Sequence, residues 1–201
     1  MFNEKKLIEL PVVATVPQNN APVATGQTTN FNNNILFYKG VDPDSIADLN
    51  NKILIVRNAI EKNCIDLGIS SNIPINLYIH SPGGNMLAGF AAADIIEKEY
   101  INTHIQGCAG SAASVMSVCG KHRTITKHSF IMIHQLSSLF GGNFNEFKDY
   151  QKNIDLFMET LKNVYKQHTK LPKDKLDEIL SHDLWWNAET ALEYGLVDEI
   201  V

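Results

Sequence analysis

Apolar residues recur along this chain at two spacings, one helical and one strand-like. Asp42 and Pro43 can begin a helix, and the apolar residues that follow come every three or four positions. This spacing predicts an amphipathic helix with a core-facing stripe formed by Ile46, Leu49, Ile53, Val56 and Ile60. A second long helix, ending near His168, is predicted from an apolar face comprising Phe147, Tyr150, Ile154, Phe157, Leu161 and Val164.

Short apolar runs between glycine-containing turns indicate strands. They are predicted at residues 35–38, 75–79, 101–106, 130–134 and 196–201. Further helices are predicted at residues 86–98, 112–119, 173–180 and between Asn187 and Gly195. Because strands alternate with helices, the chain is expected to form an α/β fold with a mainly parallel sheet.

The length of the chain favours one globular domain. Its 201 residues are 44% hydrophobic, which is enough for a substantial single core. We place this domain at residues 34–201. Residues 1–33 are rich in Asn, Thr, Gln, Pro and Ala and are predicted to form a flexible N-terminal arm. The alternative is that a strand around Val12 to Val16 docks onto a partner.

Charge and cysteine content exclude several classes of protein. The net charge of −5 gives no electrostatic reason to expect a nucleic acid or an anionic membrane as partner. Cys64, Cys108 and Cys119 lack CxxC spacing, so neither a disulfide framework nor a zinc site is supported. The N-terminus does not have the pattern of a signal peptide, and no apolar run approaches the length of a membrane span. We therefore predict a cytoplasmic protein.

A serine lies where a strand is predicted to turn into a helix. Gly107, Ala109 and Gly110 would allow a tight corner before Ser111, and the helix that follows would begin with unpaired N–H groups. A serine in that place can act as a nucleophile, although an N-cap role for Ser111 is the simpler alternative. Ser114, one helical turn later, is a rival nucleophile. We rank it second because a serine inside a helix usually bonds back to a carbonyl.

Acyl transfer also needs a base, a group that orients the base, and donors for the oxyanion. His134 ends the predicted strand at 130–134 and would lie at the rim of the sheet. Asp183 is the better candidate for the orienting acid, because the apolar side chains that follow it are expected to shield it partly; Asp177 competes. Gly84 and Ala112 are the candidate oxyanion donors, since one permits close backbone approach and the other begins a helix.

Five ordered motifs, within residues 35–201, connect this chain to a known family. They are Tyr78-Ile79-His80-Ser81-Pro82-Gly83-Gly84, Gly107-x-Ala109-x-Ser111, Met132-Ile133-His134-Gln135, His168-Thr169 and Glu193-Tyr194-Gly195-Leu196-Val197-Asp198. As a set they resemble the Clp protease proteolytic subunit family. The resemblance implies a crotonase-like fold of stacked ββα units with a protruding handle helix, peptide-bond hydrolysis by a Ser-His-Asp triad, and neither a metal nor an organic cofactor.

The motifs carry the roles of the family onto this chain. The nucleophile falls on Ser111, the base on His134, the acid on Asp183, and the oxyanion donors on Gly84 and Ala112. The segment after His134 matches the strand that in this family lies along the substrate, so the resemblance assigns substrate binding to Gly83, Gly141 and Gly142. It also implies that the long helix is a handle between rings, and that the chain forms a homo-oligomeric ring, either a heptamer or a double ring.

The chain departs from the family pattern in four places. Ala112 and Leu136 stand where the family usually has Met and Pro, and the stretch around Gly120 to His122 is about two residues shorter. Residues 1–33 do not resemble the axial-pore loops of the family, so the sequence does not support docking to an AAA+ unfoldase. This pattern is closer to divergent relatives from bacteria or bacteriophages.

The resulting hypothesis is an ATP-independent serine endopeptidase that degrades or processes extended peptides and unfolded proteins inside a ring. The first alternative is a catalytically inactive structural subunit of a mixed ring. The second is a crotonase-type acyl-CoA enzyme, which would share the fold but would not need the three residues Ser111, His134 and Asp183.

Overall fold

The structure is a computed structural model that describes residues 33–70 and 72–201. The predicted N-terminal arm and the alternative docking strand fall, apart from residue 33, outside the described residues. The strands are β1 (Asn34–Phe37), β2 (Asn76–Ser81), β3 (Asn102–Gly110), β4 (Arg123–Ile125), β5 (Phe130–Ile133), β6 (Leu184–Trp186) and β7 (Glu199–Ile200). The helices are α1 (Pro43–Leu67), α2 (Met86–Lys98), α3 (Ala112–Val118), α4 (Phe144–His168), α5 (Leu176–Leu180) and α6 (Ala188–Glu193).

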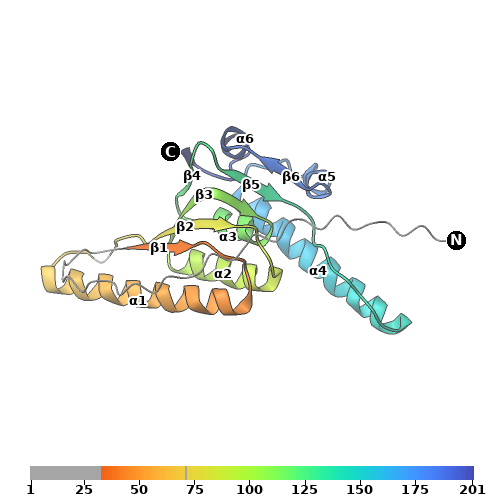
Figure 1. Ribbon diagram of the computed structural model, residues 1–201, viewed down its shortest axis with the longest axis horizontal. Helices are drawn as coiled ribbons and strands as arrows, with labels where there is room; N and C mark the ends of the chain where they lie inside the picture. Colours follow the sequence, from red (N-terminus) through yellow and green to blue (C-terminus); the bar gives the residue numbers. More distant parts are fainter. Residues whose placement is uncertain (1–32, 71) are drawn as a thin grey trace, which may run out of the picture. The chain divides into compact units, whose positions relative to one another are not determined.

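The strands form a mainly parallel sheet in the order β1-β2-β3-β4-β7 (Figure 1). β3 has two partners on the same side, because its first half pairs with β4 and its last three residues pair with β5. β6 then joins β5 in the antiparallel direction. This branching brings the end of β3, which precedes Ser111, next to the strand that leads to His134.

The predicted amphipathic character of α1 is confirmed. Asp42 forms a capping box with Ser45, as Pro43 begins the helix. Of the predicted stripe, Val56 is partly buried, and four residues are at most 5% exposed: Ile46, Leu49, Ile53 and Ile60. They pack in one core with the apolar residues of β2 and with the small residues of α2 and α3.

Several elements differ from the sequence prediction. β7 and α5 are shorter than the strand predicted at 196–201 and the helix predicted at 173–180, and β2 continues to Ser81. β4 and β6 were not predicted, because each has only three residues and gains stability from pairing with distant strands. The strand predicted at 101–106 continues to Gly110, so Gly107 lies inside β3 and is not part of the corner. Gly107 has φ 84° at an irregularity in the pairing with β2, where a Cβ atom would meet the His80 ring.

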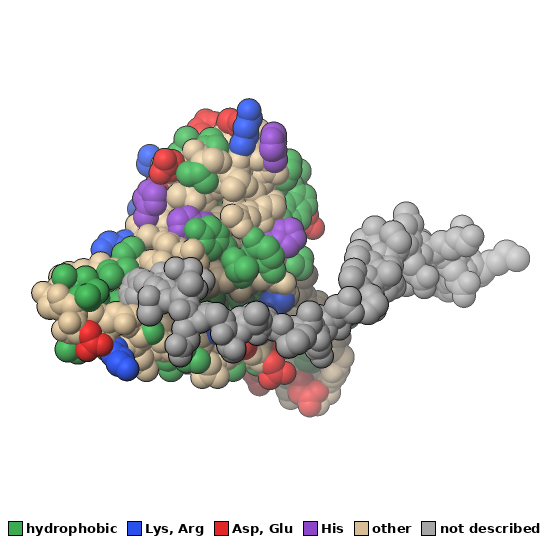
Figure 2. All heavy atoms as spheres, turned by 60° about the vertical axis from the view of Figure 1, so that its left-hand side comes forward, with side chains coloured by type: hydrophobic (Ala, Val, Ile, Leu, Met, Phe, Trp, Pro, Cys, Tyr) green, Lys and Arg blue, Asp and Glu red, His purple; other side chains and the backbone are tan. Residues whose placement is uncertain are grey.

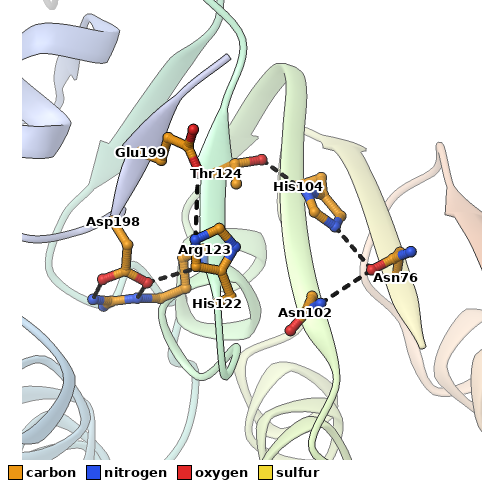
Figure 3. A network of polar contacts seen from close by, with 8 residues as sticks. All are labelled: Asn76, Asn102, His104, His122, Arg123, Thr124, Asp198 and Glu199. Carbon is orange, nitrogen blue, oxygen red and sulfur yellow. Dashed lines mark hydrogen bonds and ion pairs between the residues drawn. The ribbon is translucent and has the colours of Figure 1, made fainter. Parts of the chain in front are cut away.

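A network of polar side chains crosses the strands β2, β3 and β4 (Figure 3). His104 Nε2 lies 3.3 Å from Asn76 Oδ1, which also accepts a hydrogen bond from Asn102, and His104 Nδ1 lies 2.8 Å from the Thr124 hydroxyl. Burial, aided by the charge of His122, lowers the pKa of His104. A neutral ring that donates to Asn76 and accepts from Thr124 satisfies these contacts.

Arg123 anchors the carboxyl-terminal segment. Its guanidinium binds both carboxylate oxygens of Asp198 and donates to the carbonyl oxygens of His168 and Gly195. Burial alone would raise the pKa of Asp198, but the hydrogen bonds and charge of Arg123 outweigh it and lower this pKa. A depressed pKa means that the pair stabilises the fold above the pKa of the unfolded chain, and that this contribution is lost as the pH falls through the folded pKa.

We therefore expect Asp198→Asn to lower the free energy of unfolding by about 1 kcal/mol at neutral pH, a value reduced from that of a buried charged pair because Asp198 is partly exposed. The deficit should shrink at acid pH, as the pH falls below the ordinary pKa of an aspartate and the wild-type carboxylate takes up its proton. Urea unfolding at both pH values measures it. Glu199→Gln is the control, since Glu199 makes only a 3.6 Å contact with His122. An equal deficit at both pH values would contradict the prediction.

The helix α4 is buried only near its end. Leu161 and Tyr165 are its buried residues, whereas Phe144 and Phe147 are 71% and 51% exposed. The apolar face predicted from the sequence therefore exists, but the first half of it contacts the segment before the helix, where the Phe140 ring lies against Phe147 and Tyr150, and its side chains are not buried. No helix among residues 33–70 and 72–201 is long and apolar enough to cross a bilayer.

Candidate active site

Ser111 occupies the corner between β3 and α3. Its N–H donates to the carbonyl oxygen of Met132 over 2.9 Å, which fixes the corner to β5. The backbone of Ser111 has φ 51° and ψ −124°, a conformation that is strained for a residue other than glycine. Its side chain makes no capping bond to α3. The strained corner therefore holds the hydroxyl away from the helix, unlike a serine whose role is to cap it.

His134 connects Ser111 to Asp183. Its Nε2 atom lies 2.7 Å from Ser111 Oγ, and its Nδ1 atom lies 2.9 Å from Asp183 Oδ1. The histidine follows β5 and Asp183 precedes β6, so the antiparallel pairing of these strands brings the two side chains together. With Nδ1–H donated to the carboxylate, Nε2 is the acceptor for the serine hydroxyl. The arrangement can accept a proton from Ser111 Oγ.

Asp183 is not shielded as the sequence analysis expected. Its side chain is 77% exposed, whereas that of His134 is 16% exposed. The apolar residues that follow Asp183 cannot cover it, because Leu184 and Trp185 are themselves 59% and 50% exposed. In this chain the carboxylate therefore contacts solvent as well as His134.

The rival candidates have other partners. Ser114 is fully buried, and its hydroxyl donates to the carbonyl oxygen of Ser111 over 2.6 Å. Since this uses its only proton, Tyr165 must donate to Ser114 Oγ in their 2.8 Å contact. Asp177 Oδ1 lies 2.5 Å from Lys162 Nζ. Neither Ser114 nor Asp177 therefore takes part in the Ser111–His134–Asp183 chain of hydrogen bonds.

The glycine turn after β2 lies against the Ser111 corner. Gly83 has φ 95°, and a Cβ atom on it would lie 2.7 Å from Ser111 Cβ and 3.0 Å from the backbone nitrogen of Ala112. The neighbouring Gly84 has φ 150° and forms a bridge with Val41. Ala112 is the first residue of α3, where an N–H has no acceptor within the helix. The structure thus brings the Gly83–Gly84 turn, Ser111 and Ala112 close together.

Gly141 and Gly142 lie further along the chain, just before α4. Residues 134–142 form no strand. A Cβ atom on Gly141 would meet nothing within 4 Å, and one on Gly142 would meet Phe140 and Glu146. No contact within the described chain joins these two glycines to Ser111 or His134, so their assignment to substrate binding stays a prediction.

Two neighbours of the site were not identified from the sequence. Trp185 lies beside Gly110, where a Cβ atom would approach its ring to 3.1 Å, and it pairs with Met132 across β5 and β6. Ser81 is fully buried and accepts a hydrogen bond from the Gly83 N–H. The serine of the Ser-Pro-Gly-Gly turn was visible in the sequence, but its role depends on how the turn closes. Trp185 was missed because β6, the strand that places it beside β5, was not predicted.

Comparisons with known proteins agree with this architecture. The model of the Clp protease family matches residues 33–201. The ATP-dependent Clp protease proteolytic subunit of Deinococcus radiodurans is 36% identical over 131 residues, which span 63% of this chain and 64% of that protein. Subunit 1 of the same name from Protochlamydia amoebophila is 30% identical over 184 residues, 81% of this chain and 89% of that protein.

A solved structure supports the same assignment at the level of the fold. The ClpP1 mutant from Listeria monocytogenes superposes with a TM-score of 0.72 at 22% identity, and the match covers 84% of this chain and 91% of that one. The predicted crotonase-like α/β fold is confirmed. With the family model covering residues 33–201, the chain belongs to the Clp protease family.

Proposed function

We propose that this protein is a serine endopeptidase whose nucleophile, base and orienting acid are Ser111, His134 and Asp183. The observation that carries the proposal is the continuous pair of contacts, 2.7 Å and 2.9 Å long, that joins these side chains through the His134 ring. Membership of the Clp protease family supports peptides as the substrate class.

The proposed reaction uses groups of this chain alone. Ser111 Oγ attacks the peptide carbonyl while His134 Nε2 takes its proton, and Asp183 holds the ring and stabilises its charged form. The N–H groups of Gly84 and Ala112 are assigned to the oxyanion. His134 then returns the proton to the leaving amine, and water hydrolyses the acyl-enzyme by the reverse sequence. None of these steps consumes a nucleotide, so we propose that hydrolysis itself is ATP-independent.

We further propose that the chain works as an oligomeric ring. Leu139 is 99% exposed, and it precedes the exposed aromatic side chains of Phe144 and Phe147 at the beginning of α4. Other apolar side chains are exposed on α1, and Figure 2 shows apolar patches on the face that lies on the left of Figure 1. Exposed apolar patches mark protein contacts. Contacts between copies of this chain would cover them.

Labelling with a fluorophosphonate probe tests the nucleophile. We expect wild-type protein to be labelled on Ser111, the Ser111→Ala variant to lose labelling, and Ser114→Ala to retain it. Labelling that persists in Ser111→Ala and disappears in Ser114→Ala would overturn the assignment.

The Ser114→Ala control removes the partner of the buried Tyr165 hydroxyl, which costs about 1 to 3 kcal/mol. If that variant folds poorly, the double variant Ser114→Ala/Tyr165→Phe serves in its place. Removing both partners of a buried hydrogen bond is closer to neutral than removing one. Circular dichroism establishes that each variant is folded.

Sedimentation velocity tests the ring. We expect the full chain at micromolar concentration to sediment as an oligomer, and Phe144→Asp/Phe147→Asp to shift it towards smaller species, because a charge in an apolar contact is costly. Leu54→Asp, a substitution on the exposed side of α1, is the comparison that separates α4 contacts from others. A stable wild-type monomer would contradict the proposal.

A further inference from the structure

Three side chains that can bind a metal converge where three helices end. Glu97 lies in the last turn of α2, Cys119 is the C-cap residue of α3, and His168 is the last residue of α4. A carboxylate oxygen, the Cys119 sulfur and a ring nitrogen of His168 lie within 4.8 Å of one another. His168 Nε2 is 2.6 Å from Glu97 Oε1. Small movements of the side chains would bring all three atoms onto one ion.

The electrostatic surroundings favour a cation at this place. The carboxyl end of a helix carries partial negative charge, and α2 and α4 both end here. Glu97 adds a formal negative charge, and Asp94, one turn earlier on α2, is close enough to act on Cys119 as well. The positive charge of Arg123 also acts on Cys119, but its guanidinium is paired with Asp198.

The chemistry of the donors selects among cations. Thiolate and imidazole bind Zn²⁺ well, whereas Mg²⁺ and Ca²⁺ take oxygen ligands. Three protein ligands leave the fourth tetrahedral position for water. Cys119 is only 5% exposed, but the side chains of Glu97 and His168 are 45% and 24% exposed, so an ion can enter from the solvent side.

We propose that Glu97, Cys119 and His168 form a zinc-binding site that joins the carboxyl ends of α2, α3 and α4. On binding, the Cys119 thiol releases its proton to solvent, and the His168 ring gives up the Nε2 proton that it shares with Glu97 and carries its remaining proton on Nδ1. Bonds from His168 Nε2 and from the Glu97 carboxylate to the ion then replace the hydrogen bond between these two side chains. Since α3 begins directly after Ser111, the ion would hold the other end of the helix that forms the Ser111 corner. This site goes beyond the proposed peptidase function and does not depend on it.

Zinc binding has to overcome the protonation of the Cys119 thiol. Burial, reinforced by the charges of Glu97 and Asp94, raises the pKa of Cys119 to about 12. The metal-free thiol is therefore neutral at physiological pH and a poor nucleophile. Zinc binding must displace its proton, as it does at structural zinc sites generally.

The site can be tested on the full chain after dialysis against a chelator. Competition with a chromophoric zinc chelator should reveal about one bound Zn²⁺ per chain. Co²⁺ bound in its place should show thiolate-to-cobalt charge-transfer absorption in the near ultraviolet, which reports the Cys119 ligand. Failure of wild-type protein to bind Zn²⁺ in this competition would overturn the proposal.

Substitutions locate the ion. Cys119→Ser, His168→Gln and Glu97→Gln should each weaken zinc binding at least about 10- to 100-fold. A loss of that size is typical even for substitution of residues that only hydrogen-bond to a metal ligand. Glu97→Gln is the variant safest for folding, since the side chain is half exposed and Gln can still bond His168. Unchanged zinc affinity in Glu97→Gln or Cys119→Ser would overturn the proposal.

Matched controls separate this site from others. Cys108→Ser removes a free thiol that lies 4.0 Å from His80 Nδ1, a rival pair for a thiophilic ion, and it should bind zinc like wild type. A loss of binding in Cys108→Ser instead would place the ion there and refute the site proposed. Ser111→Ala should bind zinc with wild-type affinity. The test of the zinc site is therefore independent of the test of the peptidase nucleophile.

Discussion

His134→Ala is expected to lower kcat for peptide hydrolysis by roughly 10⁵- to 10⁶-fold, because the residue both accepts the Ser111 proton and delivers it to the leaving amine. Its two contacts, to Ser111 Oγ and to Asp183 Oδ1, are lost together. The initial rate of cleavage of a fluorescently quenched unfolded protein measures the effect. His128→Ala is the control, since His128 lies exposed in the turn before β5. A His134→Ala enzyme within tenfold of wild type would exclude the proposed base.

The role of Asp183 can be tested in the same assay. It acts through His134, so the double variant His134→Ala/Asp183→Asn should be no slower than His134→Ala alone. Asp183→Asn by itself should lower kcat by roughly 10²- to 10⁴-fold. The loss should not exceed that for a buried orienting acid, about 10⁴-fold, because this carboxylate is 77% exposed and water competes for its hydrogen bonds. Asp177→Asn, which breaks a surface pair with Lys162, should leave kcat unchanged.

Gly83→Ala is expected to lower the free energy of unfolding by about 2 to 6 kcal/mol, from backbone strain at φ 95° together with overpacking. The added Cβ would lie 2.7 Å from Ser111 Cβ and would also meet the Gly110 carbonyl oxygen. Both neighbours belong to the corner that carries Ser111. We therefore expect fluorophosphonate labelling of Ser111 to slow along with the loss of stability.

Gly141→Ala is the matched control for Gly83→Ala. A Cβ at Gly141 meets nothing within 4 Å, so its unfolding free energy should stay within about 0.5 kcal/mol of wild type. Thermal and urea unfolding should be compared at one protein concentration, because assembly of copies would otherwise change apparent stability. If Gly83→Ala unfolds like Gly141→Ala, the close packing of the glycine turn against Ser111 is wrong.

The long helices and the central strands could be predicted because their residues report local periodicity. In α1, a cap at Asp42 and a stripe every three or four residues determine both the start and the buried face. The short strands β4 and β6 could not be predicted in this way. Three residues carry almost no periodic signal, and what stabilises them is hydrogen bonding to β3, β7 and β5, which are distant in sequence.

In the candidate site, too, residue types could be predicted from the sequence, whereas contacts between distant segments could not. Ser111, His134 and Asp183 could be proposed from their residue types and from the family motifs, as could the glycine turn. The sequence already ranked Ser114 second, because a serine inside a helix usually bonds back to a carbonyl, and its hydroxyl does donate to the Ser111 carbonyl oxygen. The tertiary structure adds that the buried Tyr165 hydroxyl, on α4, forms a hydrogen bond with Ser114 Oγ. The strained backbone of Ser111 directs the oxygen of that residue away from the helix.

The sequence by itself determined the α/β fold class, the long helices with the buried face of α1, and the set of residues proposed for acyl transfer, because these depend on local spacing and on side-chain chemistry. Only the tertiary structure decided the exposure of Asp183, the packing of Gly83 against Ser111, and the meeting of Glu97, Cys119 and His168. Those features arise where segments far apart in the chain come together, and such distances are set by packing of the whole domain rather than by any one segment.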